Sequence, residues 1–462
     1  MELEIHFSHK KPKFLQIYEG IRQGILLGNF RKDTQLPAKR KLAVQLNVSV
    51  ITVQQAYDQL VSEGYIYSIE RRGYFVAAIL EEWHEQKNKT EDLPNNQQEV
   101  PPAYNFRNGQ VDLHSFPYNQ WLRIYREKLQ MLSPQNAPWQ GEEVLRRAIA
   151  QYLATARGLS CSYQQVFVFS GFQQQFMNCM LFFEDRSIGI EEPGFMRAKA
   201  TLRQLGRPYK LVDVDEEGCQ VPDLHINCLY MTPAHQFPNG QVMTIQRRID
   251  LLNWARKNQG VIIEDDYDSE FRYTGTPIPT LANLDQLQHV IYFGTFSKTL
   301  MPSLRISYIV LPAHFVKPFE DFNKHLKSTV SKVDQHTLAE FINKELYSKH
   351  VAKMRVLYRK KRMHLLKNIE RYLGQGFKVK GEEAGLHIVL ELPAHLTEDH
   401  VIHQAYQQGI ALDRISSLYE QQKPNNQIMI GYGEPSLEEI EHGIKKLSYF
   451  LCGDHNDRQI SQ

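Results

Sequence analysis

Short apolar runs of strand length alternate with amphipathic stretches through the middle of the chain. The runs read QVFVFSG, RSIGIEEPG, CLYMTPA, GVIIEDDYD, HVIYFGTFS and RISYIVL. Between them lie stretches such as IQRRIDLLNWARKN, whose apolar residues have the spacing of a helix. Buried strands that alternate with helices are typical of a mainly parallel sheet covered on both faces. The pattern therefore predicts an α/β domain.

The pattern changes on both sides of this region. After about residue 313 it becomes helical and then mixed up to Phe450, which predicts a small C-terminal α+β subdomain. Residues 81–102 are polar, nearly free of aliphatic side chains and closed by two prolines, as in a solvated linker. We therefore expect a small domain over residues 1–80, a linker over 81–102 and a large domain over 103–455.

The small domain has the pattern of a DNA-binding unit. Residues 13–28 carry apolar positions at helical spacing and end at a glycine. Residues 36–66 predict a helix, a short turn and a second helix with Ser49 as its N-cap, which fits a tight helix-turn-helix. The next residues alternate like two strands around the basic tip at 71–73. A helix that can enter the major groove beside a basic hairpin is a DNA-binding arrangement.

Composition limits the number of domains, the kind of partner and the cellular compartment that we expect. The 462 residues allow two or three domains, and the net charge of +2 means that any nucleic-acid surface is local. The cysteines, Cys161, Cys179, Cys219, Cys228 and Cys452, have neither the paired spacing of a zinc site nor the density of a disulfide scaffold. No window reaches the ~18 apolar residues of a membrane span, and the N-terminus has charges and a proline where a signal peptide needs an unbroken apolar run. We expect a reduced, cytoplasmic protein without a metal site.

The small domain resembles the winged helix-turn-helix of GntR-type bacterial repressors. The resemblance rests on a leucine-proline, a small residue and an arginine, then LA, VS, T, AY, L and EGY, and a closing glycine-aromatic-FV. Family members often carry arginines at the positions of Val50 and Gln54, so guanine readout is not expected there, whereas Gln54 suits adenine. The resemblance implies binding to double-stranded promoter DNA. The candidate DNA-binding residues are Arg40, Ser49, Thr52, Gln54, Arg71, Arg72 and Gly73.

The stretch YFGTFSKTLMPSLRISY places Lys298 between two hydroxyl residues. Pyridoxal 5'-phosphate requires a lysine for its Schiff base, a carboxylate at the ring nitrogen, a donor near the phenolate oxygen, an aromatic against the ring and a phosphate cup. Asp265 and Tyr267 are two residues apart on a predicted strand, so their side chains share a face. Asp266 is the alternative partner for the ring nitrogen. The candidate cofactor-binding residues are Lys298, Asp265, Tyr267, Arg305, Thr295, Ser297, Gly171, Phe172, Gln173 and Phe195.

These motifs, in this order, resemble fold-type I aminotransferases, which depend on pyridoxal phosphate, over roughly residues 103–450. Aminotransferases usually carry an asparagine beside a proline-threonine-glycine turn, whereas this chain has TPAHQFPNG with Phe237 at that place. Together with EDDYDSEFRY and the GntR-like domain, this variant resembles the MocR/GabR-type regulators over nearly the whole chain. The resemblance implies a multidomain fold, with a winged helix-turn-helix, an α/β aminotransferase-like domain and a small C-terminal α+β subdomain, and a head-to-tail homodimer.

We therefore expect a DNA-binding transcriptional regulator that senses an amino compound, or pyridoxal phosphate itself, through the Lys298 internal aldimine. If the compound carries a carboxylate, Arg197 or Arg414 is expected to bind it bidentately. The alternatives are an active aminotransferase that carries a DNA-binding domain and a binding module without a cofactor. Phe237 in place of the asparagine favours sensing over catalytic turnover.

Overall fold

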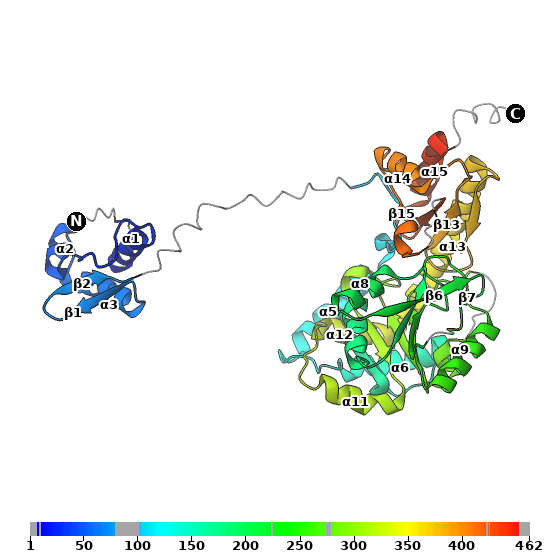
Figure 1. Ribbon diagram of the computed structural model, residues 1–462, viewed down its shortest axis with the longest axis horizontal. Helices are drawn as coiled ribbons and strands as arrows, with labels where there is room; N and C mark the ends of the chain where they lie inside the picture. The colour runs from blue at the N-terminus through cyan, green and yellow to red at the C-terminus, as the bar shows by residue number, and fades with distance from the viewer. Residues whose placement is uncertain are drawn as a thin grey trace. The chain divides into compact units, whose positions relative to one another are not determined.

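The computed structural model describes residues 7–8, 11–78, 101–222, 225–273, 279–421, 424 and 426–451. The chain divides into two compact units, Met1–Val100 and Pro101–Gln462 (Figure 1). Of the expected linker at 81–102, all but Pro101 and Pro102 lies outside the described residues. Within the described ranges, no helix combines the length and the apolar character that crossing a bilayer requires.

The small unit is a winged helix-turn-helix, as the sequence predicted. Its elements are α1 (Lys13–Leu26), α2 (Lys39–Gln45), α3 (Val50–Ser62), β1 (Ile66–Ile69) and β2 (Gly73–Val76). The strands β1 and β2 pair antiparallel and form the hairpin. Each helix contributes fully buried side chains to one core, among them Ile17, Leu42 and Val53. Helix α1 ends just before Gly28, which has a φ of +77°.

The large unit is built on an eight-stranded sheet in the order β4-β11-β10-β9-β8-β5-β6-β7. The strands are β4 (Val166–Phe169), β5 (Ile188–Glu192), β6 (Tyr209–Asp215), β7 (Gly218–Cys219), β8 (Cys228–Met231), β9 (Val261–Asp266), β10 (Val290–Thr295) and β11 (Ser307–Val310). The strands from β10 to β6 run parallel, whereas β11 is antiparallel to both of its neighbours and β7 is antiparallel to β6. The predicted mainly parallel sheet is confirmed.

Apolar side chains cover the sheet on both faces. All four residues of β4 are buried, and they alternate between two cores: Val166 and Val168 belong to one, Phe167 and Phe169 to the other. The helices of this region are α5 (Tyr118–Met131), α6 (Glu143–Arg157), α7 (Phe172–Phe182), α8 (Met196–Gln204), α9 (Ile245–Asn258), α10 (Leu281–Leu284), α11 (Ala313–Asn323), α12 (Lys332–Asn343) and α13 (Leu346–Leu373), with short 3-10 turns at Leu113–Ser115, Tyr163–Gln165 and Pro302–Leu304.

A smaller α+β subdomain completes the large unit. Its sheet has the order β12-β13-β16-β15, and a separate strand, β14, pairs with β3 from the start of the unit. The elements are β3 (Tyr104–Asn105), β12 (Lys378–Lys380), β13 (His387–Glu391), α14 (Glu398–Gln407), β14 (Ile410–Ala411), β15 (Asp413–Arg414), a 3-10 turn (Ser416–Leu418), β16 (Gln427–Gly431) and α15 (Leu437–Leu451). The pairing of β3 with β14 brings the first residues of the unit to its C-terminal subdomain.

Candidate functional site

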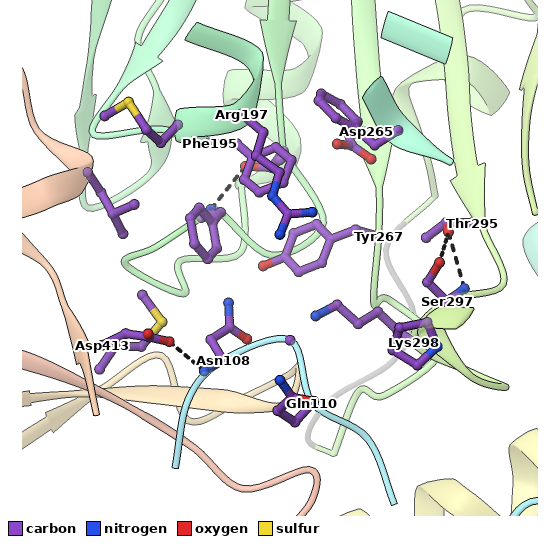
Figure 2. A pocket seen from close by; sticks show the side chains of 18 of the residues that line it. Asn108, Gln110, Phe195, Arg197, Asp265, Tyr267, Thr295, Ser297, Lys298 and Asp413 are labelled. Carbon is purple, nitrogen blue, oxygen red and sulfur yellow. Dashed lines mark hydrogen bonds between the residues drawn. The ribbon is translucent and has the colours of Figure 1, made fainter. Parts of the chain in front are cut away.

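A cavity of about 490 Å³ lies where the C-terminal ends of the parallel strands meet the small subdomain (Figure 2). Ligands of α/β proteins bind at this end of a parallel sheet. The predicted residues that line the cavity are Phe172, Phe195, Arg197, Asp265, Tyr267, Thr295, Ser297, Lys298, Arg305 and Arg414. Gly171 and Gln173 are not lining residues, although Gly171 lies against Arg305. The structure thus gathers side chains from strands far apart in the sequence.

Lys298 follows strand β10, and its amine points into the cavity (Figure 2). Burial lowers the pKa of this amine, and the charge of Arg197 lowers it further, against the opposite influence of Asp268 and Asp413. Gly109 lies close to this amine, since a Cβ added to Gly109 would be 3.5 Å from Lys298 Nζ. An amine whose pKa is lowered in this way is a better nucleophile near neutral pH.

The two aspartates at the end of β9 face opposite sides of the sheet. Asp265 lines the cavity, and its carboxylate accepts a hydrogen bond from the Tyr230 hydroxyl at 2.5 Å. Asp266 instead lies 3.3 Å from the guanidinium of Arg157 and accepts a hydrogen bond from Tyr292 at 2.5 Å. Burial raises the pKa of Asp265 to about 7. Of the two, only Asp265 lines the cavity.

The polar end of the cavity lies beside the N-terminus of α7, where Phe172 lines it. Gly171 is the N-cap of this helix, and a Cβ placed on it would lie 2.4 Å from Arg305 Nη2. The hydroxyl of Thr295 accepts the backbone N–H of Ser297 at 3.2 Å and donates to the hydroxyl of Ser297 at 3.1 Å. Free N–H groups at a helix N-terminus, with a guanidinium beside them, form an arrangement that binds anions.

The two predicted effector-binding arginines differ in their surroundings. Arg197, on α8, lines the cavity and acts electrostatically on Lys298. Arg414 also lines the cavity, but its guanidinium forms an ion pair with Asp399 of α14. Its neighbour Asp413 lines the cavity too, and accepts the backbone N–H of Asn108 at 2.6 Å. Of these two arginines, only Arg414 has a carboxylate partner among the ion pairs of the described residues.

Sequence reasoning missed a buried polar group beside Tyr267. His235 Nδ1 lies 3.0 Å from the Tyr267 hydroxyl and 3.0 Å from a carboxylate oxygen of Asp268. His387 packs against His235 with 5.0 Å between ring centroids, and its Nε2 contacts the Pro238 carbonyl at 2.9 Å. His235 and Asp268 stand in the stretches TPAHQFPNG and EDDYDSEFRY, but no local pattern shows that they meet, because they lie 33 positions apart along the chain.

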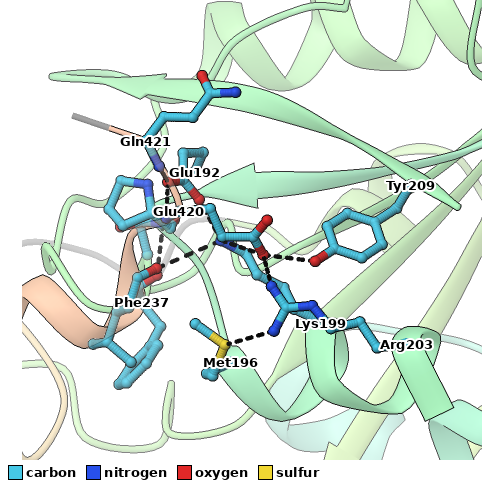
Figure 3. A network of polar contacts seen from close by, with 11 residues as sticks. Glu192, Met196, Lys199, Arg203, Tyr209, Phe237, Glu420 and Gln421 are labelled. Atoms are coloured by element: carbon cyan, nitrogen blue, oxygen red, sulfur yellow. Dashed lines mark hydrogen bonds and ion pairs between the residues drawn. The ribbon is translucent and has the colours of Figure 1, made fainter. Parts of the chain in front are cut away.

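A network of charged side chains, of which Lys199 and Glu192 are buried, connects α8 to the segment that follows β15 (Figure 3). Lys199 of α8 is fully buried and pairs with the carboxylate of Glu192. Glu192 also accepts the backbone N–H groups of Glu420 and Gln421, at 2.5 and 2.9 Å. Arg203 donates to the Glu420 carboxylate at 2.7 Å. The helix that carries Arg197 is thus tied to the small subdomain on one side of the cavity.

The predicted recognition helix α3 begins at a well-formed cap. Ser49 Oγ accepts the backbone N–H of Thr52 at 3.1 Å and lies 2.8 Å from the Thr52 hydroxyl. The side chain of Gln54 contacts both Lys39 and Asp58. An adenine contact by Gln54 would therefore compete with two existing hydrogen bonds.

The predicted basic tip forms the turn of the β1–β2 hairpin. Arg71 has a φ of +63° and Gly73 a φ of +112°, and the backbone N–H of Arg72 donates to the Ile69 carbonyl at 3.0 Å. Arg71 and Arg72 are both exposed, and so is Arg40 on α2. These cations are available to a polyanion.

Two family profiles match the chain: bacterial regulatory proteins, gntR family, at residues 13–76, and aminotransferase class I and II at residues 134–447. The uncharacterized HTH-type transcriptional regulator YdeL of Bacillus subtilis is 39% identical, over 94% of this chain and 96% of YdeL. The probable rhizopine catabolism regulatory protein MocR of Rhizobium meliloti is 30% identical, over 96% and 94% of the two chains. A multiple substrate aminotransferase from Thermococcus profundus has the same fold, with a TM-score of 0.70 at 22% identity, covering 77% of this chain and 92% of that one.

Proposed function

The chain belongs to the MocR/GabR-type transcriptional regulators, which join a GntR DNA-binding domain to an aminotransferase class I and II domain, and we propose that its large domain binds pyridoxal phosphate on Lys298 to sense an amino compound. The aminotransferase fold family depends on this cofactor. The observation that carries the proposal is the position of Lys298 in one cavity with Asp265, Tyr267 and Arg305.

The charges of the cavity fit this cofactor. Among the ion pairs of the described residues, none involves Asp265, and its raised pKa reflects a buried carboxylate without a cation. A protonated ring nitrogen would supply that cation. At the other end, the close approach of Arg305 to Gly171 leaves a cradle of N–H groups and hydroxyls for a phosphate. Both ends of the cavity therefore suit a phosphorylated pyridine.

Lys298 and an incoming amine would compete for the same carbon of the cofactor. When bound, pyridoxal phosphate supplies an aldehyde that condenses reversibly with primary amines. An amine that displaces Lys298 returns a free side-chain amine to the cavity, beside Asp268 and Asp413. A ligand shifts a conformational equilibrium only through such a difference between two states. Arg197 would hold a carboxylate on the ligand, since it lines the cavity and has no ion-pair partner among the described residues.

The small unit would convert this change into altered promoter binding. Helix α3 would enter the major groove, and the hairpin tip at Arg71 and Arg72 would contact the adjacent backbone. A single winged helix has a small interface, so we propose a homodimer with two such units on paired half-sites, held head-to-tail by the large domains. Sedimentation of the full chain would test the dimer, because a monomer at micromolar concentration would contradict it.

Chemical trapping tests the role of Lys298 directly. The full chain is mixed with pyridoxal phosphate, reduced with borohydride, digested and mapped by mass spectrometry. We expect the cofactor on Lys298, and no fixed cofactor in Lys298→Ala. Lys344→Ala, which changes a surface lysine paired with Glu340, is the matched control and should label like the wild type. Label on another lysine, or equal label in Lys298→Ala, would overturn the assignment.

A further inference from the structure

The polar group behind Tyr267 is fully enclosed. The side chain of His235 is 0% exposed and that of Asp268 is 2% exposed. His235 Nδ1 lies 3.0 and 3.2 Å from the two carboxylate oxygens of Asp268, and 3.0 Å from the Tyr267 hydroxyl. A Cβ on Gly385 would lie 2.1 Å from His235 Cε1, so the ring fits only against a glycine. The ring is therefore held in one place by its surroundings.

The contact with Asp268 decides which nitrogen of His235 carries a proton. A carboxylate oxygen accepts hydrogen bonds, so the contact of both Asp268 oxygens with Nδ1 assigns the shared proton to Nδ1. A nitrogen that already carries a proton cannot accept the one from Tyr267. The Tyr267 oxygen can then only accept from Nδ1–H, and its own O–H is free to point elsewhere. Figure 2 shows the Tyr267 hydroxyl directed into the cavity that Lys298 also lines.

We propose that Asp268 and His235 are positioning residues that make Tyr267 a hydrogen-bond donor into the cavity, aimed at the anionic ring oxygen of the bound cofactor. This inference rests on the proposed function. Phe237, which also lines the cavity, has no polar group to offer there, and its backbone N–H is already donated to the Thr232 hydroxyl at 3.0 Å. Because Phe237 supplies no second donor, hydrogen bonding to the ring oxygen depends on the direction in which the Tyr267 proton points.

A further neighbour of His235, His387, does not compete for the proton on Nδ1. His387 packs on the ring, and burial lowers the pKa of His387 to about 3, so it is neutral. Its Nε2–H donates to the Pro238 carbonyl at 2.9 Å. The charged groups that act on Lys298 are Asp268, Arg197 and Asp413. Any change at Asp268 therefore alters both the hydrogen bonds of Tyr267 and the electrostatic field at Lys298.

These two effects have opposite signs, which makes the proposal testable. The cofactor bound to Lys298 changes its absorbance when it loses the proton shared between its ring oxygen and the lysine nitrogen. Removing the negative charge of Asp268 favours loss of this proton, and so lowers the pH of the change. Removing the Tyr267 donor disfavours the anionic oxygen, and so raises that pH by about one unit. If the pH of the transition rises in an Asp268 variant, the cause is therefore the lost hydrogen bond from Tyr267 and not the lost charge of Asp268.

The experiment compares four forms of the full chain loaded with pyridoxal phosphate: wild type, Tyr267→Phe, Asp268→Leu, and Asp268→Leu combined with His235→Phe. In Asp268→Leu, His235 Nδ1 is free to accept the Tyr267 proton. The pH of the absorbance transition should therefore rise, as it does in Tyr267→Phe. In the double variant Tyr267 has no internal acceptor, so the transition should return to the wild-type pH or below it. A fall or no change in Asp268→Leu, or a double variant that behaves like Asp268→Leu, would overturn the proposal.

A second measurement does not depend on the cofactor. In the cofactor-free protein, nitrogen NMR of labelled histidine should show the His235 proton on Nδ1 in the wild type and no longer confined to Nδ1 in Asp268→Leu. A wild-type proton on Nε2 would refute the inference even if Lys298 binds the cofactor. A proton on Nδ1 in a protein that binds no pyridoxal phosphate would refute the proposed function and leave the tautomer assignment intact.

Discussion

Gly171→Ala should weaken the binding of pyridoxal phosphate through Arg305. A Cβ on residue 171 would lie 2.4 Å from Arg305 Nη2 and 2.6 Å from Cζ, so the guanidinium must move. Gly171 also has φ 87° and ψ 174°, a region that only glycine readily populates, and alanine there adds strain of about 1–3 kcal/mol. A hydrogen bond to a charged group contributes about 1.5–3 kcal/mol. Loss of the contact between Arg305 and the phosphate therefore predicts a roughly 10- to 150-fold higher Kd.

Pyridoxal without its phosphate separates this contact from a general effect on the fold. Absorbance titrations should show a large rise in Kd for pyridoxal phosphate and little change for pyridoxal in Gly171→Ala. Gly206→Ala is the matched control, since Gly206 has a φ of +65° and no atom within 4 Å of the added Cβ. It should lower stability modestly, by about 1–2 kcal/mol, and leave both affinities unchanged. An equal loss for both ligands, or an unchanged Kd for pyridoxal phosphate, would refute the assigned phosphate cradle.

Burial raises the pKa of Asp265 from 3.8 to about 7, so its stabilising contribution is complete below about pH 4 and is lost as the pH rises through about 7. Urea unfolding of the cofactor-free chain should therefore show a smaller fall in stability between about pH 5 and about pH 8 in Asp265→Asn than in the wild type; equal falls would contradict the raised pKa. Lys199→Met should lower the free energy of unfolding by about 3–5 kcal/mol, because Glu192 is left buried without its cation, whereas Lys317→Met, in an exposed pair, should change it by less than about 0.5 kcal/mol. Similar urea midpoints for the two lysine variants would contradict this reasoning. Arg72→Ala should reduce the slope of log affinity for DNA against log salt by about one unit, and an unchanged slope would exclude a phosphate contact at the hairpin tip.

The architecture was predictable because local patterns report burial. The four residues VFVF of β4 are apolar at every position, which is what a strand covered on both faces requires, and the structure places alternate residues in two cores. The small unit was equally accessible, since Ser49 and the glycine after α1 mark helix ends by chemistry that acts within a few residues. These elements depend on neighbours in the sequence, so the sequence shows them.

The site was predictable only in part, because several of its contacts join distant segments. Residue types alone left Asp265 and Asp266 as alternatives, and the choice depends on Arg157, an ion-pair partner on α6. Arg414 was a candidate for binding a carboxylate, but a carboxylate on α14 already pairs with it. His235 stands in the stretch TPAHQFPNG, but its contacts could not be predicted, because only the folded sheet brings Tyr267 and Asp268 to it. Polar networks of this kind are set by tertiary packing rather than by local propensity.

Displacement of Lys298 by an amine is expected to alter promoter binding, and a paired titration tests this link most directly. The full chain, loaded with pyridoxal phosphate and bound to DNA selected from a random pool, is titrated with a panel of primary amines and amino acids. Cofactor absorbance and DNA affinity are followed together. We expect that at least one compound changes both signals with the same midpoint, and that neither signal responds in Lys298→Ala. A cofactor signal without any change in DNA affinity, or sustained keto-acid production of the order of 1 per second, would contradict it.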